Sequence, residues 1–197
     1  MEFYLVIIQA LWLVLPAYVA NGCALLVGGG TPIDFGKKYK DGKRILGDGK
    51  TWRGLITGAF LGMTAGFGFA IVAKYGAMYP ETSWLGINDF TGFPLMIPII
   101  GAICFGALLG DITESFFKRR AGIIRGESWI PFDQIDFILG VLFFSFIMGL
   151  FLDALGLTEG NWFIQTFKIP HIIVLLILTP FFHFLGNFLH KTAKKSK

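Results

Sequence analysis

Five stretches of this chain are long and apolar enough to cross a lipid bilayer, and they constrain its fold more than any other feature of the sequence. A membrane-spanning helix needs about 20 predominantly apolar residues. The stretches lie at about 3–27, 54–73, 93–110, 135–152 and 169–189. We therefore expect an all-α, polytopic membrane protein with five transmembrane helices, in which residues 1–197 form a single integral-membrane domain.

The composition agrees with a membrane location. Hydrophobic residues make up 54% of the chain and charged residues only 15%, against roughly 25% charged residues in an ordinary soluble domain. Too few polar residues remain to cover the surface of a globular protein. This argues against a soluble enzyme and excludes an intrinsically disordered chain.

The lysines and arginines are distributed unevenly between the segments that join the apolar stretches. All of the 17 basic residues except Lys74 and Lys168 lie at about 28–53, at about 111–134 or in the C-terminal tail. Cytoplasmic segments carry the excess of Lys and Arg, so we expect these three in the cytoplasm and the N-terminus outside the cell membrane. Loops this short hold no nucleic-acid recognition fold, so we expect no nucleic-acid partner. The sequence leaves the oligomeric state open.

The segment at about 28–53 is rich in glycine, lysine, arginine and hydroxyl side chains. Glycines next to cations are typical of a backbone that approaches phosphate groups closely. Gly49, Lys50 and Thr51 look like the end of a P-loop, but that motif needs a glycine five positions before Gly49, where this chain has Arg44. We therefore predict an anion-binding loop of another kind.

Carboxylates stand at the cytoplasmic ends of the third and fourth apolar stretches. Four residues are spaced i, i+3, i+4 and i+7 and therefore share one helix face: Asp111, Glu114, Ser115 and Lys118. Asp133 and Asp136 form a second acidic pair where the fourth stretch begins. Two such pairs can meet around a divalent cation, and oxygen ligands beside lysine and arginine suit Mg²⁺-dependent chemistry on a nucleoside triphosphate.

The alternative is a set of ion pairs that cap the two helix ends without any further role. We favour a functional site because carboxylates at this depth in a membrane protein are costly unless they are paired or functional.

The same residues resemble a known family. CTP-dependent phosphatidate cytidylyltransferases share a signature that reads Gly-Asp, Ser-x-x-Lys-Arg and later Asp-Arg-x-Asp. Two runs of this chain resemble it: Gly110-Asp111-Ile-Thr-Glu114-Ser115-Phe-Phe-Lys118-Arg119 and Asp133-Gln134-Ile-Asp136. Gln134 replaces the arginine of the family pattern, and Arg125-Gly126 stands near its lysine-aspartate pair. The Pro-Gly-His-Gly-Gly element of the family is absent from this sequence.

The first basic segment looks more like the archaeal branch of that family, the CDP-archaeol synthases. The similarity rests on the smaller number of spans and on two runs: Pro32-Ile-Asp34-x-Gly36-Lys37 and Gly47-Asp48-Gly49-Lys50-Thr51-Trp52-Arg53-Gly54. It implies transfer of the cytidylyl group of CTP to a phosphatidate-type membrane lipid, digeranylgeranylglyceryl phosphate in an archaeon, at the cytoplasmic face. The implied products are CDP-archaeol and pyrophosphate, and the implied cofactor is Mg²⁺.

The resemblance also implies roles for individual residues. We expect Asp111, Asp133 and Asp136 to bind Mg²⁺, and Glu114 to be a further ligand or a partner of the ligands. We expect Ser115, Lys118 and Arg119 to hold phosphate oxygens of the lipid or of the triphosphate. The residues expected to bind or orient the nucleotide are Asn21, Asp34, Lys37, Arg44, Asp48, Lys50, Thr51 and Arg53.

Two alternatives from other classes remain open. A CTP-dependent polyprenol kinase would transfer the γ-phosphoryl group to a lipid alcohol, so its nucleotide product would be CDP and no pyrophosphate would form. A non-enzymatic transporter or lipid-binding protein would carry its carboxylates near the middle of the membrane, whereas here they cluster at the cytoplasmic ends of the spans. We favour the cytidylyltransferase.

Overall fold

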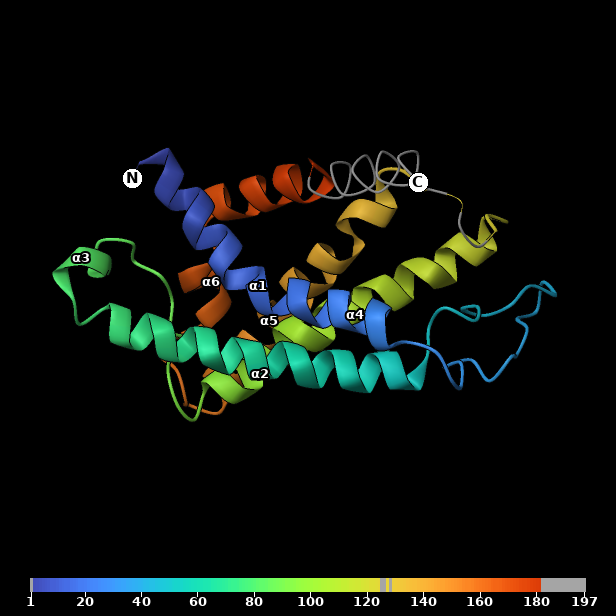
Figure 1. Cartoon of the computed structure of the whole chain (residues 1–197), viewed down its shortest axis with the longest axis horizontal. Helices are drawn as coiled ribbons and strands as arrows, with labels where there is room; N and C mark the ends of the chain where they lie inside the picture. The colour runs from blue at the N-terminus through green and yellow to red at the C-terminus, as the bar shows by residue number, and fades with distance from the viewer. Residues whose placement is uncertain (1, 125–126, 128, 182–197) are drawn as a thin grey trace, which may run out of the picture.

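The computed structural model describes residues 2–124, 127 and 129–181 of the chain, which form helices joined by loops (Figure 1). The four long helices are α1 (Phe3–Val27), α2 (Trp52–Gly76), α4 (Met96–Arg120) and α5 (Phe132–Ala154). Two short helices, α3 (Pro80–Ser83) and α6 (Trp162–Thr166), follow α2 and α5. This described part contains no β-strand and only two isolated β-bridges, so the predicted all-α class is confirmed.

Each of the four long helices is long and apolar enough to cross a membrane. The fifth predicted span, at about 169–189, begins with a shorter apolar helix at Ile169–Phe181. The rest of that span lies outside the described residues, as do Arg125, Gly126 and the C-terminal lysines. These helices are those of a polytopic membrane protein, whereas the fifth span, the orientation across the membrane and the single-domain organisation stay predictions.

Helix α4 extends beyond the apolar stretch that predicted it. That stretch ends at Gly110, but the helix continues to Arg120. Asp111 and Lys118 therefore lie on a continuous helix rather than in an irregular loop, in agreement with the helix face that their spacing predicts. Hydropathy shows where a helix leaves the apolar part of the membrane. Residues with a high helix propensity, such as lysine and arginine, allow the helix itself to continue beyond that point.

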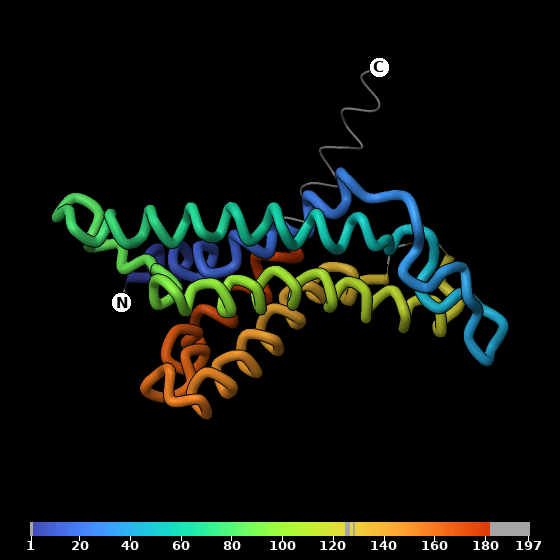
Figure 2. Tube along the Cα trace, turned by 90° about the horizontal axis from the view of Figure 1, so that it is seen from below, coloured from blue at the N-terminus to red at the C-terminus, as the bar shows by residue number. Residues whose placement is uncertain are grey.

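Helices α1, α2 and α4 pack against one another, and α4 also packs against α5 (Figure 1). The loop between α1 and α2 meets the C-terminal end of α4 at one end of the molecule, and the N-terminus and α3 lie at the other end. Figure 2 shows that α5 diverges from α1, α2 and α4 toward its own C-terminal end. The two segments predicted to be cytoplasmic therefore share one end of the bundle.

Glycines allow the helices to approach one another closely. A Cβ atom added at Gly58 of α2 would lie 2.7 Å from the carbonyl oxygen of Ala20 in α1. A Cβ atom added at Gly110 of α4 would overlap the carbonyl oxygen of Asp136 in α5. Small residues permit such backbone contacts between helices in membranes. The α4–α5 contact is important for the site because it places Asp111, the neighbour of Gly110, beside Asp136.

The core lies between α1, α4 and α5. Its wholly buried side chains include Leu13, Val14, Ile100, Ile103 and Val141. The helix at Ile169–Phe181 is joined to α1 by a hydrogen bond of 2.9 Å between the hydroxyl groups of Tyr18 and Thr179. This apolar scaffold fixes the relative positions of α4 and α5, which carry the acidic residues of the site.

Candidate active site

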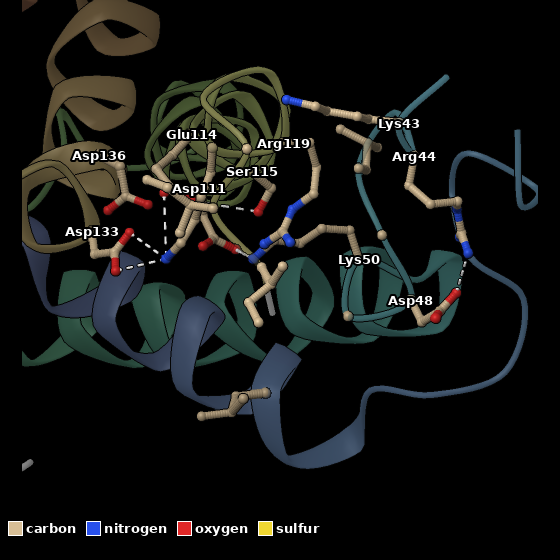
Figure 3. Close-up of a pocket in the computed structure, with 18 residues that line it drawn as sticks. Lys43, Arg44, Asp48, Lys50, Asp111, Glu114, Ser115, Arg119, Asp133 and Asp136 are labelled. Atoms are coloured by element: carbon tan, nitrogen blue, oxygen red, sulfur yellow. Dashed lines mark hydrogen bonds and ion pairs between the residues drawn. The ribbon is translucent and has the colours of Figure 1, made fainter. Parts of the chain in front are cut away.

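A cavity of about 760 Å³ opens where the loop between α1 and α2 meets α4 and α5. Its polar lining combines residues of the loop with residues of the two helices: Lys43, Arg44, Asp48, Lys50, Asp111, Glu114, Ser115, Lys118, Arg119, Asp133 and Asp136. Figure 3 shows Lys43 and Lys50 of the loop extending toward the helix residues, whereas Arg44 extends toward Asp48. Every residue predicted to be catalytic therefore lines one cavity, and the individual roles stay predictions.

Asp111, Glu114 and Asp136 bring their carboxylates together at the α4–α5 contact. One carboxylate oxygen of each residue lies within 4.8 Å of those of the other two. The close approach of the backbones at Gly110 makes this spacing possible. Three oxygen ligands so arranged fit a hard divalent cation such as Mg²⁺.

Glu114 provides a second observation that points to a cation. Its Oε1 atom is buried and has no hydrogen-bond partner among the described residues. The Nζ atom of Lys118 lies 3.8 Å from it, beyond hydrogen-bonding distance. Lys118 thus forms an ion pair with this oxygen but donates no hydrogen bond to it. A buried carboxylate oxygen without a hydrogen bond is costly, and a bound metal ion would satisfy it.

Asp133 is placed differently from the other two members of the predicted metal triad. Both of its carboxylate oxygens accept hydrogen bonds of 2.7 Å from Lys118 Nζ, and Oδ2 also accepts one of 2.8 Å from the backbone N–H of Trp129. Glu114, and not Asp133, completes the three-carboxylate cluster. The assignment of Asp133 to the metal stays a prediction.

Lys50 connects the loop to the acidic cluster. Its Nζ atom lies 2.5 Å from Asp111 Oδ2, although the two residues are far apart in the sequence. Their side chains are 22% and 27% exposed, so the pair faces the open cavity. A phosphate group that enters the cavity can therefore compete with Asp111 for this lysine.

Asp34 organises the loop itself. Its buried carboxylate accepts hydrogen bonds from the Arg44 guanidinium at 2.8 and 3.2 Å and from the backbone N–H groups of Leu46, Gly47 and Gly36 at 3.0 Å. Burial acts to raise the pKa of Asp34, but these hydrogen bonds outweigh it and hold the pKa well below its usual range. The carboxylate is therefore charged at neutral pH and fixes the turn that carries Arg44.

Asp48 and Thr51 of the loop also form hydrogen bonds. Arg44 also donates a hydrogen bond of 2.6 Å to Asp48 Oδ1. Thr51 Oγ1 accepts hydrogen bonds from the backbone N–H groups of Gly54 at 3.1 Å and Gly29 at 3.2 Å. Thr51 thereby caps the N-terminus of α2 and holds the start of the loop against its end.

Arg120 docks the loop on α4. Its guanidinium lies over the rings of Tyr39 and Phe116, at 4.9 and 5.2 Å from the ring centres. The same group donates a hydrogen bond of 3.0 Å to Asp41 Oδ1 and another to the backbone carbonyl of Arg44. The guanidinium is planar and carries five N–H donors, so arginine can stack on an aromatic ring and donate hydrogen bonds at the same time.

The role of Arg120 was not predicted from the sequence. It stands in a run of three basic residues at a helix end, a pattern that membrane topology alone explains. Tyr39, an aromatic residue between lysines in the other basic segment, is the signal that could have indicated a stacking partner.

The other residues predicted to bind nucleotide do not line the larger cavity. Asn21 lines a smaller cavity of about 290 Å³, which shares Lys50 and Asp111 with the larger one. Lys37 and Arg53 are exposed and do not line either of these two cavities. Arg53 instead donates hydrogen bonds of 2.8 and 2.6 Å to two backbone carbonyls at the end of α1.

The charges in the larger cavity suit a polyanionic substrate. Arg119 contributes a buried Nε atom that has no hydrogen-bond partner within the described part of the chain. Lys50 and Lys118 are balanced by carboxylates at the cavity wall. A nucleoside triphosphate with a divalent cation matches this arrangement, because the cations can contact the phosphates while the carboxylates hold the metal.

The chain matches the model of a family described as CarS-like, CDP-archaeol synthase, over residues 3–194. The CDP-archaeol synthase of Methanospirillum hungatei JF-1 is 40% identical over 169 residues, which cover 86% of this chain and 89% of that protein. Those of Methanocorpusculum labreanum and Archaeoglobus fulgidus are 43% and 40% identical, over 86% and 93% of this chain and 90% and 92% of theirs.

A solved structure is also similar to this chain. It is described as an intramembrane enzyme for archaeal membrane lipids biosynthesis. It aligns with a TM-score of 0.68 at 34% sequence identity and covers 92% of this chain and 94% of its own. The likeness therefore extends over nearly the whole chain.

Proposed function

The chain belongs to the CarS-like family of CDP-archaeol synthases, and from this premise we propose how its residues carry out the reaction. It is a cytidylyltransferase of membrane phospholipid biosynthesis that converts a lipid phosphate into CDP-archaeol. We propose CTP as the nucleotide, digeranylgeranylglyceryl phosphate as the lipid and pyrophosphate as the second product. We further propose that the reaction takes place at the cytoplasmic face of the cell membrane.

The observation that carries this proposal is the meeting of the acidic cluster and the cationic loop in one cavity. Asp111, Glu114 and Asp136 lie within 4.8 Å of one another, and Lys50 of the loop contacts the first of them at 2.5 Å. Nucleotidyl transfer needs both elements, because a triphosphate is bound through a metal ion and through side-chain cations together.

We assign the metal to Asp111, Glu114 and Asp136, whose carboxylates are the closest group. Mg²⁺ held there would neutralise charge on the phosphate oxygens and orient the triphosphate. Asp133 is proposed as a further ligand, which becomes available when a phosphate draws Lys118 Nζ away from it.

The cations of the cavity are proposed to bind the triphosphate and the leaving pyrophosphate. Arg44, Lys50, Lys118 and Arg119 line the cavity and can reach phosphate oxygens, with Ser115 as a hydroxyl donor. Asp34, Asp48 and Thr51 orient the loop that carries Arg44 and Lys50. Asn21, which lines the smaller cavity, is proposed to contact the nucleoside. Lys37 and Arg53 add positive charge at the outside of the loop.

The chemistry needs no strong general base. The acceptor is a phosphate monoester, and with a second pKa near 6 it is largely dianionic at pH 7. One of its oxygens attacks the α-phosphorus of CTP, a new P–O bond forms, and the bond from the α-phosphorus to the bridging oxygen of pyrophosphate breaks. Catalysis then consists of positioning the two reactants and neutralising the charge that develops on the leaving group.

The experiment that tests this function follows the label of radioactive CTP. Purified protein in detergent is incubated with Mg²⁺, the archaeal lipid phosphate and CTP labelled at the α-phosphate. We expect label to enter the organic phase with release of pyrophosphate, and no transfer without a divalent cation. A second reaction with CTP labelled at the γ-phosphate and a polyprenol tests the kinase alternative, and label in the lipid only in that reaction would overturn the proposal.

A further inference from the structure

Two exposed aromatic rings lie against each other outside the cavities: Phe35 of the loop between α1 and α2, and Trp52 at the start of α2. Their ring centres are 6.4 Å apart and the rings are inclined at 43°. Phe35 is 63% exposed and Trp52 is 41% exposed. Neither residue lines the cationic cavity or the smaller cavity beside it. The candidate active site therefore does not account for these two rings.

The backbone holds Phe35 in a conformation that aromatic residues seldom adopt. Its φ angle is +50°, in the left-handed region, where a bulky side chain is an outlier. Two successive turns fix this conformation: the N–H of Phe35 donates to the carbonyl of Pro32 at 3.0 Å, and that of Lys37 donates to the carbonyl of Asp34 at 2.8 Å. Glycine or asparagine would adopt it more easily. A strained residue that presents an exposed ring points to a partner outside the chain.

The two rings continue an exposed apolar face of α2. Trp52, Ile56 and Phe60 are spaced i, i+4 and i+8, so they lie on one side of the helix. Ile56 is 61% and Phe60 is 67% exposed. Because α2 is long and apolar enough to cross a membrane, we expect this face to contact lipid. Trp52 then lies where the helix reaches the membrane surface, the level at which tryptophan is enriched, and Phe35 extends the face onto the loop.

Cations lie next to both rings in the sequence. Lys37 and Lys38 come shortly after the first ring, and Arg53 directly follows the second; all three residues are exposed. Within the described residues, none of them forms an ion pair with a carboxylate. Arg53 donates only to two backbone carbonyls at the end of α1. Two exposed rings thus adjoin three positive charges, which is a surface suited to an anionic and partly apolar partner.

We propose that these five residues, Phe35, Lys37, Lys38, Trp52 and Arg53, form a surface that binds the headgroups of anionic phospholipids in the surrounding membrane. Aromatic rings favour the boundary between the apolar layer and the headgroups, and lysine and arginine are attracted to anionic lipid there. The partner is the bulk anionic lipid of the bilayer and not the acceptor substrate, because the surface lies outside the cavity that holds the acidic cluster.

Binding of this surface to the membrane stabilises the loop that carries Arg44 and Lys50. Phe35 is the neighbour of Asp34, whose carboxylate accepts hydrogen bonds from the Arg44 guanidinium. On the other side of Asp34, the N–H of Ile33 donates to the carbonyl of Lys50 at 2.8 Å. The position of the ring is therefore coupled to two cations of the cavity. This consequence rests on the proposed function, whereas the membrane contact itself does not.

Hydrogen–deuterium exchange of the loop amides tests the contact without turnover. The protein is placed as a single chain in nanodiscs of phosphatidylcholine, with or without phosphatidylglycerol, and neither CTP nor a lipid-phosphate acceptor is added. We expect phosphatidylglycerol to slow exchange in the loop by about 10-fold or more, because several cations act together at an anionic surface. High salt should remove this protection. Equal exchange in the two lipid compositions would overturn the proposal.

Lys38→Gln and Lys74→Gln are matched variants for the charge. Both lysines are exposed and unpaired within the described part of the chain, but Lys74 lies in the last turn of α2, at the opposite end from Trp52. We expect Lys38→Gln to reduce the protection by phosphatidylglycerol about 5-fold and Lys74→Gln to retain it. Full protection in Lys38→Gln, or an equal loss in both variants, would exclude a contact at this surface.

Phe35→Asn and Phe35→Trp test the ring. Asparagine tolerates a positive φ, so Phe35→Asn keeps the backbone and removes the ring, whereas Phe35→Trp keeps a ring. We expect Phe35→Asn to lose the protection by phosphatidylglycerol while its exchange in phosphatidylcholine stays at the wild-type level, and Phe35→Trp to retain the protection. Faster exchange of Phe35→Asn already in phosphatidylcholine would assign the ring to packing on Trp52 alone and overturn the proposal.

A second copy of the chain is the other partner that the exposed rings could contact. Protection that appears only in nanodiscs holding two copies would assign the surface to that contact and overturn the proposal. None of these measurements depends on cytidylyl transfer, so a failure of the membrane contact and a failure of the proposed function are distinguishable.

Discussion

Gly110 of α4 lies against the backbone of Asp136 in α5, so closely that a Cβ atom on the glycine would overlap the carbonyl oxygen of the aspartate. This contact places Asp111 beside Asp136 and thereby joins acidic residues from two helices into one cluster. The close packing of the two helices and the grouping of the carboxylates therefore depend on the same contact.

The substitution Gly110→Ala should therefore damage both the fold and the site. Overpacking of a tight contact typically costs about 1–3 kcal/mol of stability, and separation of the carboxylates should lower kcat about 100-fold. Thermal unfolding and cytidylyl transfer measure the two effects. Gly68→Ala is the control, because nothing lies within 4 Å of a Cβ atom there, and equal behaviour of the two variants would contradict the role of the contact.

Metal binding should depend on Glu114 more than on Asp133. Glu114 belongs to the three-carboxylate cluster, whereas Asp133 is neutralised by Lys118 at 2.7 Å. We expect Glu114→Gln to weaken Mn²⁺ binding, measured by electron paramagnetic resonance without nucleotide, by about 10-fold or more. Asp133→Asn should weaken Mn²⁺ binding less than Glu114→Gln does. A larger loss of Mn²⁺ affinity in Asp133→Asn would instead support the metal triad predicted from the sequence.

Lys50 should contribute to binding of the triphosphate. Its charge reaches into the cavity and contacts Asp111 at 2.5 Å. Loss of one charge-assisted hydrogen bond corresponds to about 10- to 100-fold in affinity, so Lys50→Met should raise KM for CTP by that factor. Lys40→Met removes a lysine of the same loop that does not line the cavity. If it raised KM for CTP as much as Lys50→Met, general loop charge rather than a contact at Lys50 would explain the effect.

Arg120 should act as a positioning residue for the loop. Its cation–π contacts with Tyr39 and Phe116 correspond to about 1–2 kcal/mol. Arg120→Met should therefore raise KM for CTP about 5- to 30-fold with little change in kcat, and should expose the loop to limited proteolysis. Arg120→Lys should rescue only in part, because lysine cannot stack and donate in the same way. A fall in kcat with an unchanged KM would show that Arg120 acts on the reacting groups instead.

Stability of the loop should depend on pH through Asp34. Its pKa in the folded protein lies below the ordinary value of about 4, so the charged carboxylate favours the folded loop. That contribution is complete above the ordinary pKa and is lost as the pH falls through the lower folded value. Protease protection of the wild-type loop should therefore decline below about pH 4. In Asp34→Asn, protection should already be lower at neutral pH and should change little on acidification; a decline matching wild type would exclude Asp34 as the cause.

The four long helices were predictable from the sequence because their signal is local: an apolar run of sufficient length specifies a membrane helix wherever it packs. The helix face that carries Asp111 and Lys118 was predictable for the same reason, since spacing alone determines it. Which of Glu114 and Asp133 completes the three-carboxylate cluster was not predictable, because it depends on how α5 is rotated against α4 at Gly110. The docking of Arg120 between two aromatic rings likewise depends on the path of a loop that has no periodic pattern.

We propose that the acidic cluster between α4 and α5 is required for cytidylyl transfer, and two aspartates of α5 provide the sharpest comparison for this role. Asp136 belongs to the cluster, whereas Asp153 lies near the other end of the same helix and accepts a hydrogen bond from the backbone of Gly160. Transfer from CTP labelled at the α-phosphate into lipid should fall by about 100-fold or more in folded Asp136→Asn and stay at the wild-type level in Asp153→Asn. Equal activity of the two variants would exclude the acidic cluster from the reaction.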